Sequence, residues 1–167
     1  ASALASIKPE TENWAFISSG TWSLMGIEVE KPILTREAME CDFTNEGTVN
    51  GHIRFLRNIT GLWLLQNLMK EWEATGEKCS YSDLIAEAEQ CKLASIVDVD
   101  APCFNKPENM GKAICRYCAE KGLEVPRTKG EFMRCVVLSL ATKYAEVKKL
   151  LEKCSGRKIE TIYIVGG

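Results

Sequence analysis

The chain has 167 residues, a length that fits one domain, and its apolar share of 46% and charged share of 26% are ordinary for a globular protein. Its net charge of −2 includes no basic run, which argues against a nucleic-acid or anionic-membrane partner. No stretch approaches the roughly 20 apolar residues needed to span a bilayer, and residues 1–12 lack the basic and apolar regions of a signal peptide.

The first third of the chain has the pattern of β-strands. Residues 14–18 are typical of a buried strand that enters a Ser-Gly turn, and residues 22–30 alternate like a second strand paired with the first. The turn-rich segment 45–51 precedes a third candidate strand at 52–56. Three strands in succession predict an antiparallel meander.

The middle of the chain has the pattern of helices. Apolar residues between 62 and 72 recur at helical spacing, and Gly76 lies just past the expected end. Residues 80–90 predict a second, more acidic helix. A connection that contains Pro102 and Pro107 then leads to a third predicted helix at 108–121.

The last third predicts one long helix and a final strand. A capping box of Thr128 and Glu131 opens the helix, which is expected to end near Gly156. Five β-forming residues at 161–165 precede two glycines, and a strand that runs into a glycine turn often leads to a phosphate-binding helix N-terminus. Strands, helices and one further strand predict an α/β fold. The expected apolar stripe of the helix is Met133, Val136, Val137, Leu140, Tyr144, Val147 and Leu151.

Eight cysteines are many for this length, and a disulfide framework, a zinc site and reduced thiols all have to be considered. Cys115 and Cys118 form a single C-x-x-C in a helical pattern, and His52 is the only histidine, so paired zinc ligands are missing. The chain is rich in ordinary helix formers and does not need disulfides for its core. We therefore expect mostly buried or idle thiols and a cytoplasmic location.

A polar run at residues 18–23 is the best candidate for binding chemistry. Its hydroxyls and its glycine could present hydrogen-bond donors to a phosphate without any lysine. The same composition also suits a simple hairpin turn, and a Walker phosphate loop is absent. Both interpretations stay open at this point.

A second polar set combines the segment 45–47 with Asn58 and Gln66. These amides flank a strongly apolar helix and could recognise hydroxyls or a nucleotide. Turn chemistry and a solvated helix face explain the same residues without a ligand. A single histidine supports neither a Ser-His-Asp nor a Cys-His catalytic arrangement.

At several runs the sequence resembles the L-rhamnulokinases, which are sugar kinases of the FGGY group. The resemblance covers essentially the whole chain, is most specific between residues 14 and 70, and is weaker from about 75 to 125. The runs that carry it are I-S-S-G-T-W-S-L-M-G at 17–26, T-N-E-G at 44–47, R-F-L-R-N-I at 54–59, G-L-W-L-L-Q at 61–66 and I-V-G-G at 164–167.

The resemblance implies an actin-like (ribonuclease H-like) ATPase domain, one of two that flank a cleft. It implies phosphorylation of L-rhamnulose at its 1-hydroxyl, with ATP and Mg²⁺. It also assigns roles by motif match. Asn58 belongs to the substrate side of the cleft, and no residue of the chain is a metal ligand. The residues assigned to the nucleotide are Ser19, Gly20, Thr21, Gln66 and Gly167.

The resemblance also implies that residues 1–167 form a C-terminal, ATP-side domain that is incomplete at both ends. The catalytic aspartate is expected in a His-Asp-Thr motif just upstream of Ala1, and a sugar-binding N-terminal domain is the expected partner. The final strand is expected as the fourth of a five-stranded sheet. The isolated chain is therefore expected to be inactive.

Two alternatives stay open beside this interpretation. The chain could belong to another FGGY sugar kinase, such as a fuculokinase or a xylulokinase, although Trp22 directly after Gly20 and Thr21 favours the rhamnulose branch. It could also be a non-catalytic actin-like interaction module. The presence of both nucleotide-contacting segments argues against that alternative.

Overall fold

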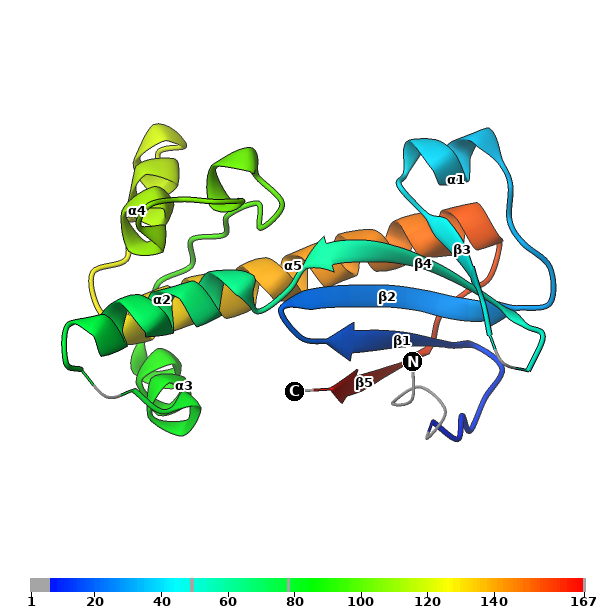
Figure 1. The fold of residues 1–167 in the computed structure, drawn as a ribbon, viewed down its shortest axis with the longest axis horizontal. Helices are drawn as coiled ribbons and strands as arrows, with labels where there is room; N and C mark the ends of the chain where they lie inside the picture. Colours follow the sequence, from blue (N-terminus) through cyan, green and yellow to red (C-terminus); the bar gives the residue numbers. More distant parts are fainter. Residues whose placement is uncertain (1–6, 49, 78, 167) are drawn as a thin grey trace. The chain divides into compact units, whose positions relative to one another are not determined.

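The structure, a computed structural model, describes residues 7–48, 50–77 and 79–166 (Figure 1). The chain forms two compact units. Unit 1 contains the residues up to Thr60 together with those from Tyr144 onward, and unit 2 runs from Gly61 to Lys143. None of the helices in the described ranges has the length and apolarity needed to cross a membrane.

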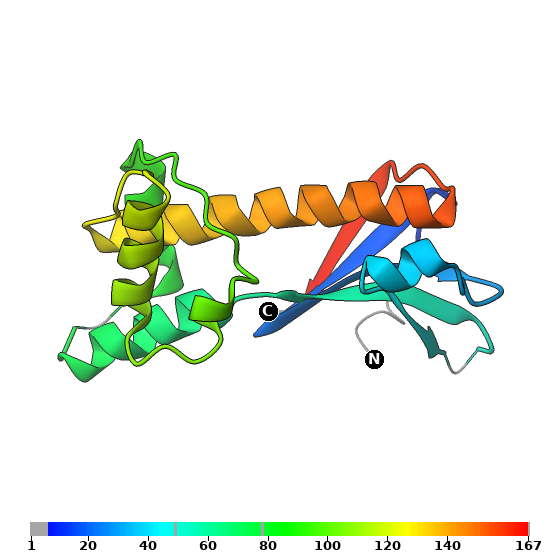
Figure 2. The same cartoon turned by 90° about the horizontal axis from the view of Figure 1, so that it is seen from above.

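Unit 1 is built on a five-stranded sheet with the order β3-β4-β2-β1-β5. Neighbouring strands are antiparallel except for β5, which runs parallel to β1. The part of α5 that belongs to this unit runs along one face of the sheet (Figures 1 and 2). The strands are β1 (Trp14–Ser19), β2 (Trp22–Val29), β3 (Thr44–Gly47), β4 (Ile53–Thr60) and β5 (Thr161–Gly166).

The predicted antiparallel meander is confirmed by β1, β2 and β4, but the predicted turn at 45–51 is partly wrong. Residues 44–47 form β3, because each of them pairs with a residue of β4. The turn itself is shorter: the N–H of Gly51 donates to the carbonyl oxygen of Thr48 at 3.2 Å. The final strand is consequently the fifth along the chain and not the fourth.

A short helix, α1 (Arg36–Glu40), was not expected from the sequence. The side chain of Thr35 caps it by accepting a hydrogen bond from the N–H of Ala38 at 3.1 Å. Lys153, in the last turn of α5, forms an ion pair with Glu37 at 2.5 Å. The end of α5 is thereby linked to α1 within unit 1.

Gly26 lies where β2 and β4 approach most closely. A Cβ atom at this position would sit 2.4 Å from the carbonyl oxygen of Phe55 and 2.6 Å from the Cβ atom of Leu56. Both contacts are too short, so the strands would have to separate in order to accommodate a methyl group. Only glycine fits this point of the core.

The Gly26→Ala variant is therefore expected to lower the free energy of unfolding by about 1–3 kcal/mol, the usual cost of overpacking a core. The measurement is the denaturation midpoint of the full-length protein. Gly47→Ala is the matched control, since an added Cβ there has nothing within 4 Å. Equal midpoints for the two variants would contradict the close approach at Gly26.

Unit 2 is helical, and the three helices predicted for it are present at nearly the expected positions. A short 3₁₀ turn, η2 (Pro102–Phe104), lies in the connection that carries the prolines. Two backbone N–H groups at the start of α4 donate to the carboxylate of Glu71 on α2. The helices are α2 (Trp63–Ala74), α3 (Tyr81–Gln90), α4 (Met110–Glu120) and the first part of α5 (Lys129–Ser155).

The predicted capping box at the start of α5 is confirmed. The N–H of Glu131 donates to the Thr128 hydroxyl at 3.2 Å, and the N–H of Thr128 donates to the Glu131 carboxylate at 3.1 Å. The predicted apolar stripe of α5 is wrong at Val137, which is 45% exposed. Val137 lies at the border of the stripe, where Cys135 and Ser139 are buried instead.

All eight cysteines are free thiols in the structure. Cys118 and Cys135 are fully buried in unit 2. Burial raises the pKa of the Cys135 thiol to about 12, and the neighbouring Cys118 adds to the shift. Cys135 therefore stays protonated at neutral pH and behaves as a small apolar core residue.

Candidate functional site

The hairpin between β1 and β2 carries the hydroxyl-rich run that the sequence singled out. Ser19 is the last residue of β1, Gly20 and Thr21 form the bend, and Trp22 is the first residue of β2. The side chain of Thr21 is exposed, whereas Ser19 and Gly20 are half-buried. The bend thus presents a hydroxyl group beside backbone amides at one end of the sheet.

The end of β5 lies directly beside this hairpin. Gly166 pairs with Ser19 in the parallel ladder between β5 and β1. Its φ of +93° belongs to a region that favours glycine, and a Cβ atom there would come within 2.4 Å of the Ser19 carbonyl oxygen. The structure therefore joins the predicted hairpin to the predicted glycine motif. Gly167, the glycine assigned from the sequence, lies outside the described residues.

Asn58 shares a face of the sheet with Trp22. Asn58 pairs with Leu24, and Trp22 lies two residues before Leu24, so all three side chains point to the same side. Asn58 is exposed, and Trp22 is 62% exposed. A polar amide and a large aromatic ring are thus available on one face, close to the hairpin.

Trp22 lies within the 18–23 run that the sequence singled out, but the sequence resemblance gave it no role at the site. The signal was present in the alternation of β2, in which Ser23, Met25 and Ile27 occupy the buried face and Trp22 must point to the other. The exposed Trp22 ring, directly after the polar turn, offers an apolar surface on the face that also carries Asn58.

The remaining predicted residues are not brought to the hairpin within unit 1. Gln66 is half-buried on α2 in unit 2. Asn45, which the sequence grouped with Asn58, forms hydrogen bonds with the backbone of a loop residue. Its amide accepts from the N–H of Ile33 at 3.0 Å and donates to the Ile33 carbonyl oxygen at 2.9 Å. The structure therefore gathers Ser19, Gly20, Thr21 and Asn58 in one unit and leaves Gln66 in the other.

On the opposite face of β2, Ser23 is fully buried and bound to Tyr144 of α5. The two hydroxyl oxygens are 2.6 Å apart. Burial raises the pKa of the Tyr144 phenol above its ordinary value, and the hydrogen bond with Ser23 partly offsets the shift. The phenol is therefore neutral throughout the physiological pH range.

Magnesium is the metal that the sequence resemblance implies. Within the described ranges, no group of three His, Cys, Asp or Glu side chains gathers closely enough to hold a metal ion. The hairpin and Gly166 offer hydroxyls and backbone amides, whereas Mg²⁺ prefers carboxylates, phosphates and water. These residues fit the phosphates of a nucleotide and do not by themselves fit the metal.

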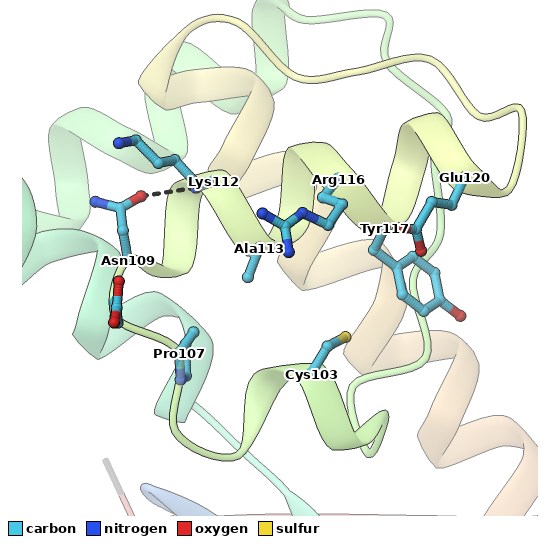
Figure 3. A pocket seen from close by; sticks show the side chains of 9 residues that line it. Cys103, Pro107, Asn109, Lys112, Ala113, Arg116, Tyr117 and Glu120 are labelled. Carbon is cyan, nitrogen blue, oxygen red and sulfur yellow. Dashed lines mark hydrogen bonds between the residues drawn. The ribbon is translucent and has the colours of Figure 1, made fainter.

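A separate hollow of about 400 Å³ lies within unit 2, between η2 and α4. Cys103 faces the α4 side chains Arg116 and Tyr117 across it (Figure 3). Burial raises the pKa of the Cys103 thiol, and the carboxylates of Glu120 and Asp98 raise it further, so the thiol is not an activated nucleophile. None of the nucleotide- or substrate-binding residues predicted from the sequence lines this hollow.

Comparison with protein families matches residues 15–167 to the FGGY family of carbohydrate kinases, C-terminal domain. A rhamnulokinase of Bacteroides thetaiotaomicron is 43% identical over 167 residues, which cover 99% of this chain and 34% of that protein. A rhamnulokinase of Bacillus subtilis is 39% identical over 168 residues, which cover 100% of this chain and 34% of that protein. The chain thus spans about a third of the length of these relatives.

Two solved structures are similar to this chain in fold. A xylulose kinase from Bifidobacterium adolescentis superposes with a TM-score of 0.57 at 15% identity, over 94% of this chain and 29% of that one. A kinase from Brucella ovis, described as a xyloylose kinase, gives a TM-score of 0.59 at 18% identity, over 94% of this chain and 31% of that one. At such low identity the likeness shows the fold alone.

Proposed function

Because the chain belongs to the FGGY family of carbohydrate kinases, as a C-terminal domain with the actin-like fold, we propose that the full-length protein transfers the γ-phosphate of ATP to a sugar hydroxyl. The similarity to rhamnulokinases supports L-rhamnulose as the sugar and its 1-hydroxyl as the acceptor. In this proposal residues 1–167 belong to the ATP-side domain, and the sugar-binding domain is its partner in the full-length protein.

The observation that carries the proposal is the pairing of Ser19 with Gly166, because it joins the two segments that are proposed to bind phosphate. Phosphoryl transfer needs little covalent chemistry from the protein and depends on positioning and charge stabilisation. In the proposed mechanism the Thr21 hydroxyl and the amides of the bend donate hydrogen bonds to phosphate oxygens. Gly166, lacking a side chain, allows the end of β5 to lie close against Ser19 beside the bend.

A general base must accept the proton of the sugar hydroxyl. In the proposed mechanism this base is the aspartate expected just upstream of Ala1. Gln66 and Gly167 keep the nucleotide-binding roles that the sequence resemblance implies. Mg²⁺ is expected to accompany ATP.

The sugar is proposed to meet the face that carries Asn58 and Trp22. The Asn58 amide can both donate to and accept from sugar hydroxyls, and the Trp22 ring offers an apolar surface for the carbon skeleton. Both side chains are exposed. This arrangement predicts that a change at Asn58 affects the KM for the sugar, whereas a change in the bend affects the reaction of ATP.

The Asn58→Ala variant of the full-length protein is expected to raise the KM for the sugar roughly tenfold, the cost of about one or two hydrogen bonds. The KM for ATP should change little. Asn45→Ala is the matched control, because its amide binds Ile33 and not the proposed ligand face, and it should affect stability without changing either KM. A proportional rise in both KM values on loss of Asn58 would contradict the assignment.

A substrate panel tests the proposal as a whole. The full-length protein should release ADP from ATP fastest with L-rhamnulose and more slowly with L-fuculose or D-xylulose. L-fuculose and D-xylulose are the alternative sugars, because another sugar kinase of the same family is the alternative interpretation of the sequence. Preference for D-xylulose would replace the sugar but keep the kinase. Failure to bind ATP or to phosphorylate any of the sugars would favour a non-catalytic module.

A further inference from the structure

Ser23 is a polar residue in an otherwise apolar row. It shares the buried face of β2 with Met25, Ile27 and Val29, and its own exposure is 0%. A hydroxyl buried in this way costs free energy unless it finds a hydrogen-bond partner. Its partner is the Tyr144 hydroxyl at 2.6 Å, supplied by a residue far away in the sequence. The pair therefore ties the hairpin strand to α5 inside unit 1.

The pair of Ser23 and Tyr144 lies at the start of β2, next to the bend. Ser23 follows Thr21 by two residues, so it is the first buried anchor after the bend. On its other side it pairs with Ile59 of β4, just before unit 1 ends at Thr60. Tyr144 is the residue at which the chain enters unit 1 again. The bond therefore fixes how β2 lies against α5 directly after the bend.

Packing alone does not explain the pair. Alanine and phenylalanine at these positions would fill similar space without burying two hydroxyl groups, and replacing both members of a buried hydrogen bond is often nearly neutral for stability. A hydrogen bond is directional. Unlike apolar packing, it therefore favours one register and one orientation of the strand relative to the helix. Orientation matters most at a site that must hold a phosphate in line.

We propose that Tyr144 is a positioning residue for phosphoryl transfer, which acts through Ser23 to hold the 19–21 bend where Thr21 meets the phosphates. The inference rests on the proposed function. Tyr144 is not a catalytic residue, since its hydroxyl is directed at Ser23 and stays neutral. Its contribution is pre-organisation, and a misplacement of about 1 Å at a reacting group costs on the order of 100-fold in rate.

The test is a double-mutant cycle in the full-length protein with Tyr144→Phe, Ser23→Ala and the combined variant. Thermal unfolding and steady-state kinetics are measured for each. Both single variants should lose stability, because each leaves one hydroxyl buried without its partner. In the combined variant the melting temperature should recover, whereas kcat should stay roughly 10- to 100-fold below that of the unmodified protein. The KM for the sugar should not change.

The combined variant decides the question, since no buried hydroxyl is left without a partner in it. Recovery of kcat together with the melting temperature would show that the bond is only structural and would overturn the proposal. Ser139→Ala is the control. This buried hydroxyl accepts from the N–H of Val97 and donates to the Cys135 carbonyl oxygen in unit 2. Its loss should lower stability and leave kcat unchanged.

Activity of the unmodified protein separates this inference from the proposed function. An unmodified protein without ATP-dependent sugar phosphorylation would overturn both. An active protein in which the combined variant has full kcat would overturn the positioning role alone.

Discussion

Replacing Gly166 with alanine is expected to reduce kcat/KM for ATP roughly 100-fold in the full-length protein, because it misplaces the bend that is proposed to bind phosphate. The backbone at Gly166 has a φ of +93°, and an alanine Cβ would lie 2.4 Å from the Ser19 carbonyl oxygen. The methyl group can be accommodated only if the end of β5 moves away from the hairpin. Steady-state kinetics with varied ATP measure the effect.

Gly156→Ala is the matched control for backbone strain. Gly156 also has a positive φ, +70°, but nothing lies within 4 Å of the Cβ atom that would be added. Both variants therefore share the strain of a left-handed alanine, and only Gly166→Ala adds the clash with Ser19. Equal losses of kcat/KM in the two variants would show that the contact with Ser19 has no role in catalysis.

The Thr21→Val variant is expected to lower kcat with little change in the KM for ATP. Valine keeps the branched shape of the side chain and removes the hydroxyl. Loss of a hydrogen bond to a charged group costs about 1.5–3 kcal/mol, which corresponds to roughly 10- to 100-fold in rate. The effect should fall on kcat if the contact strengthens in the transition state.

Thr21→Ser separates the hydroxyl from the methyl group of the same side chain. It retains the donor and should keep kcat close to that of the unmodified protein. Steady-state kinetics for the two variants provide the comparison. Wild-type kcat and KM in Thr21→Val, or an equal loss in Thr21→Ser, would mean that the bend is only a turn between two strands.

Much of the fold could be predicted from local patterns. A buried-strand pattern before a Ser-Gly turn identified β1, alternation identified β2, helical spacing identified α2, and the capping box identified the start of α5. β3 was missed because Thr-Asn-Glu-Gly has the composition of a turn and becomes a strand only through its pairing with β4. α1 was missed because it is only five residues long and too short to show a periodic signal.

The candidate site was less accessible to sequence reasoning. Motif resemblance assigned roles to Thr21 and Asn58, but it could not show that Ser19 pairs with Gly166, because these two residues are far apart in the sequence. The same holds for the hydrogen bond between Ser23 and Tyr144. The alternation of β2 does place Ser23 on the buried face, so a buried hydroxyl that needs a partner could have been inferred, but not the partner itself.

The most direct test of the central claim is a crystal structure of the full-length protein with ADP and Mg²⁺. The account predicts a phosphate oxygen within hydrogen-bonding distance of the Thr21 hydroxyl, with the bend between β1 and β2 on one side and Gly166 on the other. Phosphates bound away from both Thr21 and Gly166 would contradict it, whatever sugar the protein phosphorylates.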